Sequence, residues 1–149
     1  MTRIALWLAC LAAASPAARA APPAPRSPKA IDTSLDACMQ NHVSTAEMVD
    51  CAGAAARAYD ATLNATYQAL LAGLDAKSAQ KLRDAQRKWL QFRDADAEVW
   101  QAPWTSGTGT ILRVQSAAHA VSQLRARVES LAELADAASI DLPGQDETK

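Results

Sequence analysis

The residues able to do chemistry are few and widely spaced in this chain of 149 residues. The two histidines, His42 and His119, lie 77 positions apart, and no cluster of His, Cys and Asp has the spacing of a metal site. No Ser-His-Asp or Cys-His arrangement is visible. The carboxylates of segment 94–98 adjoin the basic residue Arg93 and are typical of a solvated helix face rather than an acid–base pair. We therefore expect no enzyme, no metal site and no cofactor.

The cysteines instead indicate one disulfide. Residues 1–20 have the pattern of an export signal, with Arg3 at the start, an apolar run, and small residues ahead of a cleavage site after Ala20. Removal of this leader would leave Cys38 and Cys51 as an even pair in an oxidising compartment, where a disulfide is expected. A redox-active pair or a metal site would need Cys-x-x-Cys spacing or further ligands.

The leader also sets the expected location, which is periplasmic or secreted. Lipidation at Cys10 is disfavoured because Trp7 stands where a lipoprotein signal carries an aliphatic residue. The apolar run is too short for a bilayer, and no later segment reaches about eighteen apolar residues, so no membrane span is expected. Loss of Arg3 and Arg19 reduces the 15 basic residues to 13 against 16 acidic ones. The resulting net charge of −3 argues against a nucleic-acid partner.

Behind the leader, the sequence predicts one helical domain over 32–139, between a proline-rich linker over 21–31 and a flexible tail over 140–149. No proline occurs between Pro28 and Pro103, and alanine is abundant, which favours helices over strands. We expect an all-α fold: a small antiparallel helical bundle with one short N-terminal helix, over 32–41, and three long ones.

Apolar residues three and four apart mark the buried face of each long helix. The first begins at a capping box, Ser44 with Glu47, and stops at Gly73; the second, opened by Asp75 or Ser78, ends before Pro103; the third covers 110–138. Their predicted stripes are, in order, Met48, Ala52, Ala55, Tyr59, Leu63, Leu70 and Leu74; Leu82, Ala85, Trp89, Phe92 and Val99; and Val114, Ala117, Val121, Leu124, Val128, Leu131, Ala135 and Ala138.

Six polar or aromatic residues on the first two long helices suggest more than packing. If these helices form an antiparallel hairpin, Asp60 faces Arg93 and forms an ion pair. The same register sets Asn64 opposite Trp89 and Tyr67 opposite Gln86. Such a network would either fix the register of the helices or line a ligand-binding cleft.

These residues also carry a family resemblance. The run of Cys51, Tyr59-Asp60, Leu63-Asn64, Tyr67, Ala85-Gln86, Trp89 and Arg93-Asp94 resembles the LprI-like lysozyme-inhibitor N-terminal domain family of exported bacterial helical proteins, over about Cys38 to Leu131. Members commonly carry two further cysteines, at positions occupied here by Ala97 and by Ala117 or Ala118. Their joint loss is what two halves of one disulfide would show, and it leaves the Cys38–Cys51 pair undisturbed. In the final helix, Ser122 and Arg125 are the nearest equivalents of the usual Thr-x-x-Arg.

The resemblance implies a protein that binds and inhibits lysozyme, a peptidoglycan-cleaving muramidase. The candidate partner-binding loop holds Trp100, Trp104, Thr105 and Ser106, whose aromatic and hydroxyl groups could enter a sugar-binding cleft. The alternative is that the two tryptophans fold back and cover the open end of the bundle. The alternative function is a periplasmic immunity or adaptor protein that binds another envelope protein and has no lysozyme target.

Overall fold

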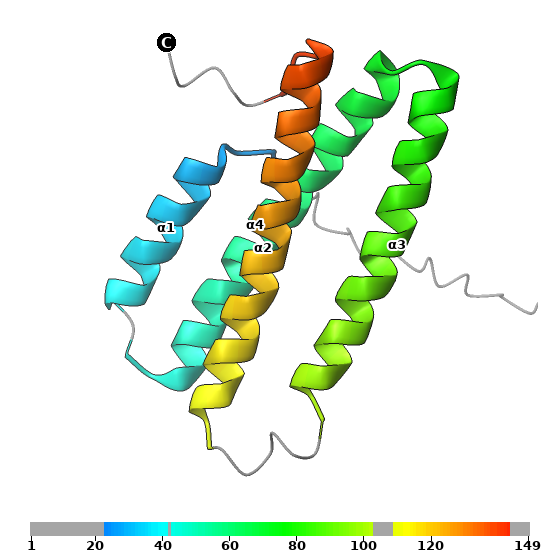
Figure 1. The fold of residues 1–149 in the computed structure, drawn as a ribbon. Coiled ribbons are helices and arrows are strands. Elements are labelled where there is room, and N and C mark those ends of the chain that lie inside the picture. Colours follow the sequence, from blue (N-terminus) through cyan, green and yellow to red (C-terminus); the bar gives the residue numbers. More distant parts are fainter. Residues whose placement is uncertain (1–22, 42, 103–108, 144–149) are drawn as a thin grey trace, which may run out of the picture.

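The computed structural model describes residues 23–41, 43–102 and 109–143. Over these residues the fold consists of four helices, α1 (Pro28–Asn41), α2 (Thr45–Gly73), α3 (Ala76–Trp100) and α4 (Ile111–Ala138), and contains no strand. Successive helices run in opposite directions (Figure 1). The prediction of an all-α bundle with one short and three long helices is thus confirmed.

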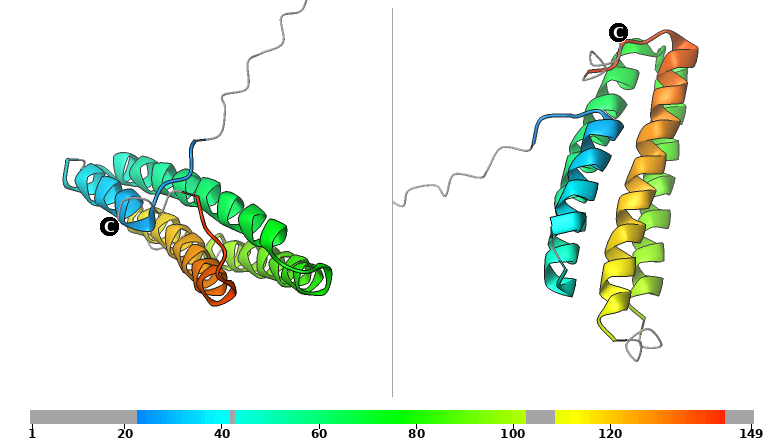
Figure 2. Two further views of the ribbon diagram at one scale, coloured as in Figure 1. Left: turned by 90° about the horizontal axis from the view of Figure 1, so that it is seen from above. Right: turned by 90° about the vertical axis from the view of Figure 1, so that its left-hand side faces the viewer.

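The centre of the bundle is the pair α2 and α4, which pack more closely than any other two helices. They run in the same direction, with α1 and α3 on opposite sides of them (Figures 1 and 2). Two side-chain hydrogen bonds join them at nearly the same sequence offset, 65 residues from Thr45 to Thr110 and 66 from Tyr59 to Arg125, as parallel helices require. Alanines on α2 allow this close approach, because interaxial distance depends on the side chains at the contact.

The stripes predicted for these two helices form most of the core. Five predicted positions on each helix are buried, whereas Ala138 at the end of α4 is exposed. The buried positions are Ala52, Ala55, Tyr59, Leu63 and Leu70 on α2, and Val121, Leu124, Val128, Leu131 and Ala135 on α4.

Capping side chains fix the start of two helices as the sequence predicts. At α2, the Ser44 hydroxyl accepts the Glu47 N–H (3.3 Å), and the Glu47 carboxylate accepts the Ser44 N–H (3.1 Å). At α3, the Asp75 carboxylate accepts the N–H groups of Lys77 and Ser78 (2.9 and 3.1 Å). Local capping hydrogen bonds therefore determine where α2 and α3 begin.

Both ends of the domain differ from the sequence prediction. α1 begins at Pro28 rather than near Asp32, because Ser27 accepts the Ala30 N–H (3.3 Å) and proline fits the first helical position. Ahead of it, the Arg26 N–H donates to the Thr62 hydroxyl (3.0 Å), so the predicted linker is anchored on α2 before residue 31. At the other end Ile140 packs on the core so closely that a Cβ at Gly73 would lie 2.7 Å from it.

α3 buries only part of the predicted stripe, since Leu82 is buried and Trp89 is half-buried. Ala85, Phe92 and Val99 are exposed, the last two by 58% and 53%. The inward face instead alternates steps of three and four through Ala79, Leu82, Gln86, Trp89, Arg93, Asp96 and Trp100. Gln86 and Asp96 bond to α4, and turning α3 to bury Phe92 would leave their partners without these hydrogen bonds.

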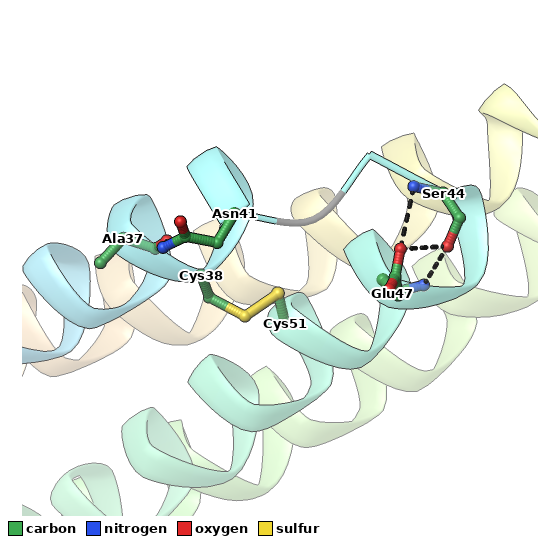
Figure 3. The surroundings of a disulfide bond; sticks show 6 residues. All are labelled: Ala37, Cys38, Asn41, Ser44, Glu47 and Cys51. Carbon is green, nitrogen blue, oxygen red and sulfur yellow. Dashed lines mark hydrogen bonds between the residues drawn. A yellow bond between two sulfur atoms is a disulfide. The ribbon is translucent and has the colours of Figure 1, made fainter.

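The predicted disulfide between Cys38 and Cys51 is present and joins α1 to the start of α2 (Figure 3). The two Cα atoms lie 5.8 Å apart, within the usual range for a bridge, and Cys51 is buried. Because 13 positions separate the cysteines, the bridge closes a short loop that contains the turn between the helices. It therefore holds the shortest helix of the bundle against α2.

Replacing both cysteines with alanine should lower the free energy of unfolding by about 3 kcal/mol, the loop-closure entropy expected for a loop of this length. Urea denaturation of the C38A/C51A variant and of the oxidised wild type measures the difference. Reduced wild-type protein, which keeps both side chains, is the matched control and should lose a similar amount. Equal stability of the oxidised and reduced proteins would contradict the role assigned to the bridge.

Candidate functional site

The contact between α3 and α4 is polar, whereas the contact between α2 and α4 is mainly apolar. Gln86, buried on α3, accepts two hydrogen bonds from the Arg127 guanidinium of α4, at 3.0 and 2.9 Å. Burial lowers the pKa of Arg127 from its ordinary value. The ring centroid of Trp89 lies close to two guanidinium carbons, 5.4 Å from that of Arg93 and 5.7 Å from that of Arg127. This half of α3 is therefore held to α4 by hydrogen bonds and cation–π contacts.

Nearer the carboxyl end of α3, Asp96 is the acceptor of a second polar cluster. Its carboxylate lies 2.6 Å from Nε2 of His119 and accepts the Gln123 amide N–H at 2.7 Å, both from α4. The ring of Trp100 stacks on His119 with centroids 4.8 Å apart. Asp96, which interrupts the predicted apolar stripe, thus occupies an inward position because α4 supplies its hydrogen-bond donors.

A groove of about 660 Å³, here called the α3/α4 groove, opens beside this second cluster. Its walls include apolar side chains of three helices as well as Arg93, Arg113, Asp96 and His119. Trp100, the first residue of the predicted partner-binding loop, also lines it. The other three predicted loop residues, Trp104, Thr105 and Ser106, lie outside the described residues.

All six residues of the predicted polar network line a second groove, of about 340 Å³, here called the α2/α3 groove. The predicted ion pair between Asp60 and Arg93 is wrong: within the described ranges Asp60 accepts a hydrogen bond from Asn64 (3.1 Å), and Arg93 pairs with Asp94 (3.0 Å). The register also set Asn64 opposite Trp89 and Tyr67 opposite Gln86, but among the described residues Asn64 bonds to Asp60 and Gln86 bonds to Arg127. The reason is that α2 and α3 diverge from their connection (Figure 1), so the inward face of α3 meets α4 instead.

A further cluster joins three helices around Tyr59, which is fully buried. Its hydroxyl donates to Asp32 of α1 (2.6 Å) and accepts from Arg125 of α4 (3.0 Å), and Arg125 also pairs with Asp32. Burial, followed by the hydrogen bond to Asp32, raises the pKa of Tyr59 to about 12. The hydrogen bond to Tyr59 raises the pKa of Arg125. The cluster therefore joins α1 and α4 to α2 at Tyr59.

The described residues contain neither a cluster suited to a metal ion nor a helix suited to a membrane. No group of three or more His, Cys, Asp or Glu is arranged to hold a metal ion there. None of the described helices has the length and apolarity needed to cross a membrane.

The family model of lysozyme inhibitor LprI matches residues 36–131, which include the disulfide, both grooves and part or all of every helix. The chain belongs to the LprI lysozyme inhibitor family. No curated protein and no solved structure gives a significant match to it.

Other LprI proteins are expected to carry a second cysteine pair at the positions that correspond here to Ala97 and to Ala117 or Ala118. Ala97 of α3 and Ala117 of α4 both line the α3/α4 groove. A bridge there would join the two helices beside the cluster of Asp96 and His119. In this member, noncovalent contacts hold that part of α3 to α4.

Two features of the LprI fold were missed in the sequence. His119 received no role because its partner Asp96 lies on another helix, 23 residues away in the sequence. Asp32 and Arg125, 93 positions apart, were likewise not connected. The available signal was the polar residue at each inward helical position, since a buried polar group must find a partner.

The raised pKa of Tyr59 predicts a loss of stability in alkaline solution. A tyrosine in the unfolded chain loses its proton near pH 10, whereas Tyr59 in the folded protein keeps it to about pH 12. Below about pH 10 its contribution is complete, and between these values the free energy of unfolding falls as pH rises, because the unfolded state binds fewer protons.

The Tyr59→Phe variant should lack this part of the fall when both proteins are unfolded in urea between about pH 9 and 11. Phe92→Leu is the control, because Phe92 is 58% exposed and carries no titratable group, and it should keep the wild-type dependence. Parallel pH profiles for wild type and Tyr59→Phe would contradict the assignment.

Proposed function

We propose that this LprI family member is exported to the periplasm or secreted, and that it binds and blocks a peptidoglycan-cleaving muramidase. The observation that carries the proposal is the family match over residues 36–131, because the family is described as one of lysozyme inhibitors. The export signal expected over residues 1–20 supports the location. A net charge of −3 after its removal favours a basic partner, although salt screens this attraction.

We further propose that the muramidase docks on one end of the bundle, here called the loop end. This end comprises the turn between α1 and α2, the last turn of α3 and the first turn of α4, which lie together at the bottom of Figure 1. Three large apolar side chains are exposed there: Val43 by 86%, Val99 by 53% and Ile111 by 56%. Apolar surface left in water supports a protein interface, because its burial drives association.

The rigidity of the loop end favours a blocking role. The Thr45 hydroxyl donates to Thr110 (3.2 Å), which joins the start of α2 to the start of α4. The disulfide holds the preceding helix in place, and Trp100 stacks on His119. An interface presented by fixed helix ends loses less conformational entropy on binding than a free peptide would.

The test uses the chain from Ala21, with its disulfide formed, in cell-wall lysis assays with a c-type, a g-type and a bacterial muramidase. Inhibition of one of them at near-stoichiometric ratio is the expected result. Absence of inhibition of all three at large excess would overturn the proposal and favour the alternative of another envelope partner.

Charge substitutions then test the docking surface. Val99→Asp and Ile111→Asp should each weaken inhibition by about ten-fold or more, because a carboxylate in an apolar contact is desolvated without a partner. Leu134→Asp is the matched control, since Leu134 is 49% exposed but lies near the opposite end of α4. All three variants should keep the wild-type melting temperature. Equal loss of inhibition in the Leu134 variant would refute docking at the loop end.

A further inference from the structure

The α2/α3 groove contains polar groups that the fold does not use. The Asn64 amide N–H donates to Asp60, but its carbonyl oxygen accepts no hydrogen bond from the described residues. The Tyr67 hydroxyl and the Arg83 guanidinium also lie in the groove wall. Neither forms a hydrogen bond or an ion pair with any residue that the structure describes. These donors and acceptors are therefore available to a ligand.

One wall of the groove is an aromatic ring in a fixed position. Trp89 is half-buried, and the guanidinium groups of Arg93 and Arg127 lie against it. The hydrogen bonds of Arg127 to Gln86 and the ion pair of Arg93 with Asp94 hold these two cations in turn. A ligand entering the groove thus meets an aromatic wall whose neighbours are already ordered.

The charges of the residues that line the groove are balanced, and Arg127, which contacts Trp89, is not among them. Arg87 is paired with Asp84 and Arg93 with Asp94, so that each contributes little net charge. The remaining ionised side chains of the wall are Asp60 and Arg83, one of each sign. A polyanion such as a nucleic acid needs an excess of unpaired cations, which this wall does not offer.

An uncharged ligand that both donates and accepts hydrogen bonds fits such a wall best. Sugar hydroxyls both donate and accept hydrogen bonds. The carboxylate, amide and guanidinium groups of the groove wall supply complementary partners, and the C–H faces of a sugar ring pack on aromatic rings. The volume of about 340 Å³ is at the lower end of the range for small-molecule sites. It therefore suits a ligand of one or two rings.

We propose that the α2/α3 groove binds an uncharged saccharide. Asn64, Tyr67 and Arg83 would bond its hydroxyls, and Trp89 would contact a ring face. This activity goes beyond muramidase inhibition and uses a different surface, because the groove extends along α2 and α3 away from the loop end. A wall glycan bound there would keep the protein at the polymer on which a muramidase acts.

The test is a titration of the ¹⁵N-labelled, disulfide-bonded chain from Ala21 with diacetylchitobiose, an uncharged dimer of N-acetylglucosamine. Saturable shifts of the Trp89 indole and of amides around Asn64 and Arg83 are expected. Asn64→Ala and Arg83→Gln should each raise Kd by about five-fold, the effect of losing one or two hydrogen bonds. Both residues are exposed, so their melting temperatures should match the wild type.

Arg113→Gln is the matched control, because Arg113 is an exposed arginine of the α3/α4 groove, and it should leave Kd unchanged. Three results would overturn the proposal: no saturable shift up to about 10 mM diacetylchitobiose, shifts centred on the α3/α4 groove, or equal shifts of the α2/α3 groove with inorganic phosphate. Failure of muramidase inhibition alone would leave it intact, since the two activities are read separately.

Discussion

Alanines along one face of α2 let α4 lie against it in parallel, and this close apolar contact determines where everything else can go. Tyr59, Leu70, Leu131 and Ala135 lose essentially all of their exposure in it. Because the pair is central, α1 and α3 are placed on its two sides. α1 is fixed by the disulfide and by the hydrogen bond of Tyr59 to Asp32. α3 has no such covalent link in the described part of the chain.

The position of α3 explains both grooves. It leaves α2 after the turn at Gly73 and meets α4 through Gln86 and Asp96, rather than through a continuous apolar stripe. The divergence from α2 opens one groove, and the other lies between the polar cluster of Asp96 and the loop end. Phe92 and Val99 remain exposed as a consequence. The surfaces proposed for ligand and partner therefore both result from the way α3 is held.

The fold was predicted well where local rules decide it. The capping box at Ser44, the cap at Asp75 and the stripes of α2 and α4 follow from neighbouring residues, and the even pair of cysteines predicted the disulfide. The candidate site was predicted in part. The six network residues do line one groove, but their predicted pairing failed because it assumed that the hairpin neighbour is the packing partner. The register of α3 depends on Arg127 and His119, more than twenty residues further along the chain, and local periodicity contains no information about such pairs.

We infer that α2 and α4 form the stable frame of the bundle and that polar contacts hold α3 to this frame more weakly. Native-state hydrogen exchange measures this directly, because each amide reports the free energy of the opening that exposes it. We expect the amides of α3 from Gln86 to Asp96 to exchange through a local opening. The free energy of this opening should be at least about 1 kcal/mol below the opening free energy of the core amides of α2 and α4. Exchange of all three helices through one opening, at the free energy of global unfolding, would contradict the account.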